Sequence, residues 1–156
     1  MPTNEKLPRS PYDSIGGVVY FARMLDKIRL HAAGELPPAY HPHLGSGFDG
    51  RCVNYLQVKY DEMRAFALEG GMDEEVLEWC YEHGRRLTAE EIEIWNGFMQ
   101  KRGWRDEASE RIAFRLKEAG LEARDSEAVT MFDFIDIDEG RTPPDFKKWE
   151  PPRFAP

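Results

Sequence analysis

Apolar residues recur every three or four positions along most of the chain, which is the spacing of a buried helical stripe. The clearest example begins at Thr88 and Glu91, whose spacing is that of a capping box. The apolar residues that follow at the helical period are Ile92, Trp95, Phe98 and Met99. Gly103 is expected to end the segment, because glycine commonly terminates helices. This region therefore predicts one well-delimited amphipathic helix.

Further helices are expected on both sides of this one. Asp73 precedes two acidic residues and is expected to cap a helix that stops at Gly84. Asp106 is expected to cap another helix, which ends at Gly120. Short helices that are joined by tight turns pack as antiparallel or orthogonal neighbours.

The first half of the chain predicts one long helix and two shorter ones. An amphipathic stripe runs from Ile15 to Ala33, and the prolines that follow Gly34 forbid its continuation. Asp49 and Asp61 are each placed to cap a short helix. Between these segments, residues 35–50 are rich in proline, glycine and histidine and predict an irregular loop.

The segment 130–139 fits both an alternating strand pattern and a helical stripe. We expect a helix, because the sequence offers no convincing second strand for it to pair with. The chain is thus predicted to be all-α, with six or seven helices in a single compact domain over residues 1–142. Residues 143–156 predict an extended, proline-rich tail with three aromatic side chains, which are Phe146, Trp149 and Phe154.

The net charge and the length of the apolar runs limit the kinds of partner that the chain is expected to bind. A chain of 156 residues is long enough for one domain, and its net charge is −8, from 21 basic and 29 acidic residues. Because a phosphate backbone attracts positive surface, this charge argues against a nucleic-acid or anionic-membrane partner. The longest apolar run, residues 18–22, is far shorter than the roughly 20 residues of a membrane span. With no signal-peptide core at the start, a cytoplasmic location is expected.

Cysteine and histidine content predicts no cofactor. In a reducing compartment, so few cysteines favour free, buried thiols at Cys52 and Cys80 over a disulfide. His41 and His43 have the spacing of half a metal site, but no dense ligand pattern accompanies them, so two exposed loop histidines are favoured. Residues 45–50 match G-x-G-x-x-G, yet no strand precedes them as a dinucleotide site requires.

The candidate site is a group of charges within two turns of the first helix. Arg23, Asp26 and Lys27 lie close together there, and two interpretations remain open. The pairs are either a solvated helix face, or a partly buried cluster in which the cations bind an anionic group that Asp26 orients. Asn96, beside Trp95, lies on the apolar face of its helix, so its amide either locks a neighbouring backbone turn or lines a polar pocket.

Several segments together resemble a known family. They are residues 9–17, 22–29, 46–49, 73–80 and 91–106. They are similar to an uncharacterised bacterial family, the domain of unknown function numbered five thousand and sixty-nine. The resemblance implies one compact bacterial domain and carries over no activity, cofactor or catalytic residue.

Two functional hypotheses follow. In the first, the protein is a binding protein or enzyme for a small anionic molecule, with residues 40–48 as a lid over the pocket. The pocket is then lined by Arg23, Asp26, Lys27, Trp95 and Asn96. In the second, it is a non-catalytic interaction module, for example a homodimer, whose aromatic tail covers the partner.

Overall fold

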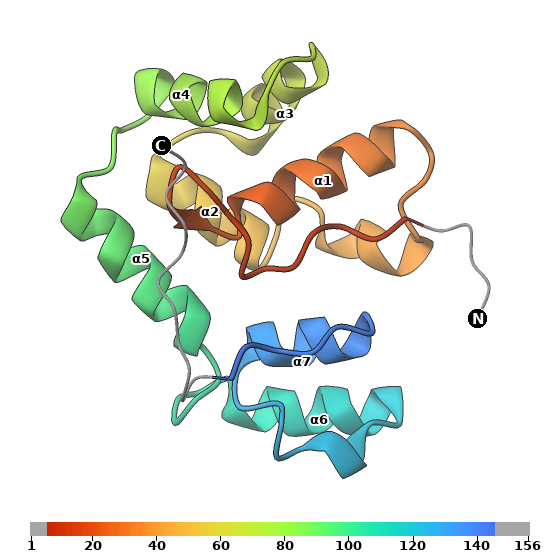
Figure 1. Cartoon of the computed structure of the whole chain (residues 1–156). Helices are drawn as coiled ribbons and strands as arrows, with labels where there is room; N and C mark the ends of the chain where they lie inside the picture. Colours follow the sequence, from red (N-terminus) through yellow and green to blue (C-terminus); the bar gives the residue numbers. More distant parts are fainter. Residues whose placement is uncertain (1–5, 146–156) are drawn as a thin grey trace.

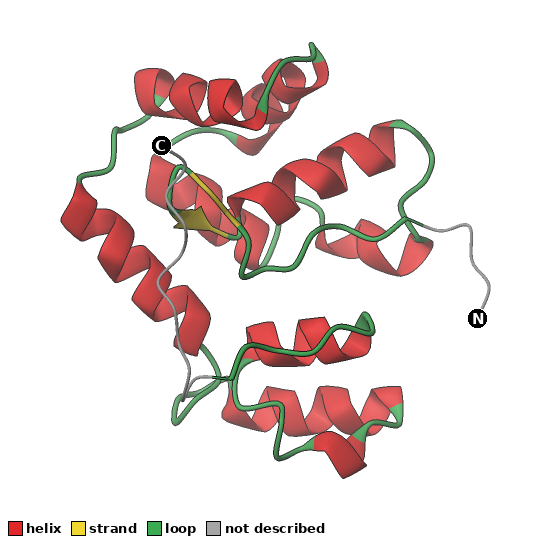
Figure 2. Cartoon of the chain, in the orientation of Figure 1, coloured by secondary structure: helices red, strands yellow, loops and turns green. Residues whose placement is uncertain are grey.

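The computed structural model describes residues 6–145. Over this range the chain forms seven α-helices, two 3-10 helices and one small hairpin, so the predicted mostly helical fold is confirmed (Figures 1 and 2). The elements in chain order are β1 (Ser14–Ile15), β2 (Val18–Val19), α1 (Phe21–Ala32), η1 (Pro38–His43), α2 (Phe48–Leu56), α3 (Tyr60–Leu68), α4 (Asp73–His83), α5 (Ala89–Lys101), α6 (Ser109–Ala119), η2 (Glu122–Arg124) and α7 (Met131–Asp138). No helix within the described range is long and apolar enough to cross a membrane.

The first helix begins at Phe21, so the prediction that it starts at Ile15 was wrong. The preceding residues form an antiparallel hairpin in which Ile15 pairs with Val18. Gly16 and Gly17 have φ values of 55° and 82°, as a two-residue hairpin turn of the primed type requires. The two glycines therefore mark a tight turn and not a helix start.

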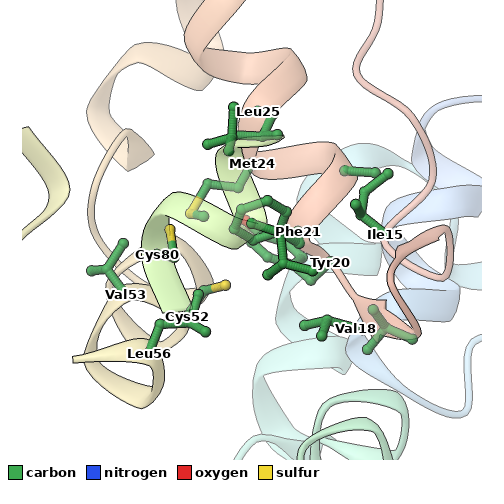
Figure 3. Packing of buried hydrophobic residues seen from close by; sticks show 14 of the residues in the cluster. Ile15, Val18, Tyr20, Phe21, Met24, Leu25, Cys52, Val53, Leu56 and Cys80 are labelled. Carbon is green, nitrogen blue, oxygen red and sulfur yellow. The ribbon is translucent and has the colours of Figure 1, made fainter. Parts of the chain in front are cut away.

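The main core lies where the hairpin meets α1, α2, α3, α4, α5 and the start of α7. In Figure 3, Phe21 and Met24 of α1 face Cys52 of α2 and Cys80 of α4. Both cysteines are buried and free, as predicted. Burial raises the pKa of the Cys80 thiol to about 12, so it behaves as an inert packed side chain.

A second, smaller apolar cluster joins α6 to α7. Its buried members are Ile112, Leu116, Ala128, Phe134 and Ile137. Helix α5 runs along one side of the molecule, and α6 and α7 lie near its C-terminal end, below α1 in the view of Figure 1. Helix α7 contacts both α5 and α6. This arrangement places α6 and α7 opposite the α1–α2 region.

The predicted helix starts are confirmed at some capping residues and shifted at others. Thr88 accepts a hydrogen bond from the Glu91 amide at 3.1 Å, and Thr130 forms a second capping box at the start of α7. The ambiguous segment 130–139 is therefore helical. Asp106 binds the Gly103 and Ala108 amides, ahead of a helix that begins three residues later at Ser109.

Candidate functional site

A cleft of about 630 Å³ separates two parts of the molecule. Helix α1, η1 and the start of α2 form one wall, and α6 with α7 forms the other. Its apolar lining includes Phe48, Met131, Phe134 and Ile135. Charged side chains from both walls also line it, so the cleft is more polar than most small-molecule sites, although its volume lies within their usual range. The cleft is therefore the candidate site.

Arg23 and Glu139 form a buried ion pair in the wall of the cleft. The two guanidinium Nη atoms of Arg23 donate to the two carboxylate oxygens of Glu139 at 2.8 and 2.6 Å. Tyr40 from η1 donates to the same carboxylate at 2.5 Å, and Arg141 also binds it. Burial raises the pKa of Glu139, but the hydrogen bonds from Arg23 and Tyr40 outweigh burial, and the net pKa is lowered. Glu139 thus stays ionised and joins α1 and η1 to the end of α7.

A second buried group contains Lys27, Asp49 and Tyr20. The Lys27 Nζ atom lies 2.9 Å from Asp49 Oδ1 and 3.2 Å from the Tyr20 hydroxyl. The Tyr20 hydroxyl donates to the same Asp49 oxygen at 2.7 Å. The other carboxylate oxygen accepts the backbone N–H of Gly45 at 3.0 Å. Lys27 and Tyr20 line the cleft, so this group forms part of its inner wall.

Burial changes the acid–base properties of this group. Desolvation lowers the pKa of Lys27, and the neighbouring Asp49 carboxylate offsets only part of that effect. Desolvation also raises the pKa of Tyr20 well above its ordinary value, and Asp49 raises it further. The phenol therefore keeps its proton at neutral pH, while the amine is easier to deprotonate than an exposed lysine.

Four arginines from three parts of the chain surround the more exposed part of the cleft. They are Arg51 of α2, Arg102 after α5, and Arg111 and Arg115 of α6. Arg102 pairs with Asp106 at 3.5 Å and Arg115 pairs with Glu118 at 3.4 Å. Within residues 6–145, neither Arg51 nor Arg111 has an acidic side chain within ion-pair distance; Arg51 instead lies over the Phe98 ring. Glu107 and Asp138 also line the cleft, and neither has an ion-pair partner within residues 6–145. Arg51 and Arg111 are therefore available to bind a ligand, but they are not an excess of positive charge in the cleft as a whole.

Asp26 lies outside the cleft. Its carboxylate accepts the backbone N–H of Arg9 and two bonds from the Arg9 side chain, each at 2.9 Å. Arg9 also binds Asp73, which in turn pairs with Arg29. The structure thus brings Arg23 and Lys27 to the cleft but places Asp26 in a separate ion network, which fixes the segment before the hairpin to α1 and α4.

Trp95 and Asn96 hold the hairpin. Asn96 accepts the Val19 N–H at 3.1 Å and donates to the Gly17 carbonyl at 2.8 Å. The Trp95 indole donates to the Val19 carbonyl at 3.0 Å. Neither residue is part of the cleft lining. Of the two interpretations of the Asn96 amide, the structure shows the backbone lock.

The predicted lid and histidines lie at η1. Tyr40, His43 and Ser46 line the cleft, so residues 40–48 form part of its wall. The His41 ring packs edge-on against His31, with 4.8 Å between ring centres, and His41 Nε2 lies 3.0 Å from the Leu36 carbonyl. Among the side chains of residues 6–145, no three His, Cys, Asp or Glu groups are arranged to hold a metal ion.

The sequence patterns did not predict that these four arginines line one cleft. Arg111 and Arg115 stand on the polar side of their helix, where a single helix gives no reason to expect anything but solvent. Arg51 and Arg102 belong to other elements, so their approach is a tertiary property. The three aromatic residues of the tail, Phe146, Trp149 and Phe154, lie outside the described residues.

The fold and the cleft define a small, mostly helical domain with arginines gathered at one concave site. The chain belongs to the family described as Domain of unknown function (DUF5069), which it matches over residues 5–141. No curated protein matches the chain. The match extends across all the elements of the fold and both walls of the cleft. Because the family is described as a domain of unknown function, the match identifies the domain but assigns it no activity.

Proposed function

We propose that this protein binds a small anionic molecule in the cleft between the α1–α2 wall and the α6–α7 wall. The observation that carries the proposal is the placement of Arg51 and Arg111, which reach the cleft from different helices without an acidic partner among the described residues. Both guanidinium groups are free to bind an anionic group, although Glu107 and Asp138 line the same cleft.

The surroundings of Arg51 support the proposal. Arg51 and Arg102 both lie over the ring of Phe98, at 5.0 and 5.7 Å from its centre. Arg102 is already paired with Asp106, whereas Arg51 has only the ring contact. An anion at this place gains charge-assisted hydrogen bonds from a guanidinium group, which suits carboxylates and phosphates.

The inner wall supports the same proposal. The cations Arg23 and Lys27 are each only 4% exposed and already bind Glu139 and Asp49. They therefore shape the inner part of the cleft, while the more exposed arginines remain available to a ligand. The apolar side chains Met131 and Phe134 offer contact for the uncharged part of that ligand.

A thermal-shift series tests this function. The full chain is heated with inorganic phosphate, sulfate, citrate and a set of small carboxylates, each at low ionic strength so that screening is weak. At least one anion is expected to raise the melting temperature, because a ligand that binds only the folded state stabilises it. The double variant R51A/R111A should lose that response.

Arg124→Ala provides the matched control. Arg124 pairs with Glu127 on an exposed part of η2 and does not line the cleft. This variant should respond to the anions as the unmodified chain does. A chain that no anion stabilises, or a double variant that responds as strongly as Arg124→Ala, would contradict the proposed function.

A further inference from the structure

We propose that Lys27 is a reactive amine that forms an imine with the carbonyl group of a small anionic carbonyl compound, such as a keto acid or an aldehyde acid. The inference rests on the proposed function for the anionic part of this compound and on the Lys27 environment for the carbonyl part. It assigns a covalent binding site in the inner wall of the cleft.

Stability alone does not account for the burial of Lys27. The amine and the Asp49 carboxylate are 4% and 0% exposed, and both lose hydration when the chain folds. A buried ion pair seldom stabilises a fold more than an apolar pair of similar volume does. Lys27 is nevertheless one of the residues that line the cleft, so it lies at the boundary of the cleft and not in the centre of the core. Desolvation is one of the ways in which proteins activate a lysine amine as a nucleophile.

The backbone at Tyr20 gives independent support. Its φ is +75°, in the left-handed region that non-glycine residues seldom adopt, and it is the residue immediately before α1. This conformation accompanies a phenol that contacts both Lys27 and Asp49. Strained backbone of this kind concentrates at functional sites, where the surrounding structure holds it in place.

Imine formation needs no reactant other than Lys27, Asp49 and the carbonyl compound. The Lys27 ammonium transfers a proton to Asp49, its neighbour at 2.9 Å, which leaves a neutral amine and a neutral carboxyl group. The amine nitrogen attacks the carbonyl carbon, a C–N bond forms, and the carbonyl π electrons move to oxygen. That oxygen takes a proton from the amine and one from Asp49 and leaves as water. The product is a protonated imine on Lys27 beside the restored Asp49 carboxylate.

The arrangement also orients the substrate. The carbonyl group must approach Lys27 and Tyr20 at the buried wall. There the Tyr20 hydroxyl can donate its hydrogen bond to the carbonyl oxygen of the substrate in place of Asp49. The anionic group then points toward the more exposed arginines, Arg51 and Arg111. A small molecule that carries both groups fits a cleft of about 630 Å³.

Reductive trapping tests the inference. The full-length protein is incubated near neutral pH with glyoxylate and cyanoborohydride, which reduces an imine to a stable amine, and peptide mass spectrometry then locates the label. Lys101 and Lys117 are exposed and report the reactivity of an ordinary lysine in the same sample. Lys27 is expected to be labelled at least about tenfold faster than Lys117.

Two variants separate reactivity from fold. Tyr20→Phe keeps the ring and Lys27 but removes the hydroxyl group, and labelling of Lys27 should slow several-fold. Tyr81→Phe, a change outside the cleft, should leave the rate unchanged. A circular dichroism spectrum and a melting curve for each variant show whether it is folded. If Lys27 in the folded, unmodified chain is labelled no faster than Lys117, the imine proposal is overturned, whatever the anion titrations show.

A neutral aldehyde distinguishes the two proposals. With propionaldehyde, Lys27 should still be labelled faster than Lys117, but the R51A/R111A variant should slow only the reaction with glyoxylate. Equal labelling of Lys27 by both aldehydes, unchanged in the arginine variant, would support the reactive lysine and overturn the anionic part of the proposal. Anion binding without any labelling of Lys27 would overturn the imine and leave the proposed function standing.

Discussion

Arg23 holds Glu139 through both of its terminal nitrogens, and the pair is buried although 116 positions separate the two residues in the chain. Arg23 belongs to the α1 wall of the cleft, and Glu139 follows directly after α7 in the opposite wall. Tyr40 from η1 binds the same carboxylate. This carboxylate and its donors therefore link the two walls, beside the buried Phe132 of α7, which packs against Tyr20 and Phe48.

Glu139→Gln is expected to destabilise the fold by about 3 kcal/mol, because it leaves the Arg23 charge buried without its counter-ion. Urea unfolding measures the change in the free energy of unfolding. Glu127→Gln, which alters an exposed pair with Arg124, should cost far less, because solvent screens exposed ion pairs. Equal effects of the two substitutions would show that the buried pair does not connect the walls.

Asp136 is expected to make stability fall as pH rises. The residue is 2% exposed, and its Oδ1 atom has no hydrogen-bond partner among the described residues. Desolvation raises its pKa to about 6 from an ordinary 3.8, although a bond from Ser10 and the Arg141 charge oppose this. Between pH 3.8 and about pH 6 the folded state binds more protons than the unfolded state, so the free energy of unfolding decreases as pH rises.

Asp136→Asn removes this titration. Relative to the unmodified chain, the variant should gain up to about 3 kcal/mol of stability between pH values near 4 and near 7. Urea unfolding of both proteins at each pH gives this difference, in which the other titrating groups largely cancel. A difference between the two proteins that does not change with pH would show that Asp136 ionises in the folded state as it does in water.

Asn96→Ala should loosen the hairpin without affecting the cleft. The substitution leaves the Val19 N–H and the Gly17 carbonyl without their partner, so we expect a loss of about 2 kcal/mol. Hydrogen exchange should show the Val19 amide losing much of its protection. Asn54→Ala, at an exposed position of α2, is the control and should change neither quantity. Unchanged exchange at Val19 in the Asn96 variant would contradict the lock.

Gly16→Ala should destabilise the turn of the same hairpin. A side chain at this position meets both a φ of +55° and the Leu77 side chain, whose Cδ2 atom would lie 2.7 Å from the new Cβ. Gly34→Ala is the control, since its φ of +73° is also positive but no atom lies within 4 Å. The melting temperature should fall further for Gly16→Ala, and an equal fall would remove the role of the Leu77 contact.

The helices could be predicted wherever local signals agree. Thr88 and Glu91 cap a helix whose apolar residues recur only at the helical spacing, and the predicted and observed helix starts coincide there. The start of α1 could not be predicted in the same way. Val18 and Val19 fit a helical stripe, but paired glycines with positive φ before them form a hairpin, which tertiary bonds from Asn96 and Trp95 hold in place.

The site could be predicted only in part. Arg23 and Lys27 are four residues apart and share one face of α1, so both reach the cleft wall. Asp26 directly precedes Lys27, about 100° away around the helix, and meets Arg9 instead. That Arg51 and Arg111 line one cleft depends on how α2 and α6 are placed in the fold. No periodicity within one helix contains that information.

Isothermal titration calorimetry of the anion that gives the largest thermal shift, performed on the unmodified chain and on R51A/R111A at low ionic strength, tests the central claim most directly. The account predicts one binding site per chain and at least about a tenfold loss of affinity in the double variant, with Arg124→Ala unchanged. Equal affinity in the double variant and the unmodified chain would contradict the assignment of this cleft as an anion site.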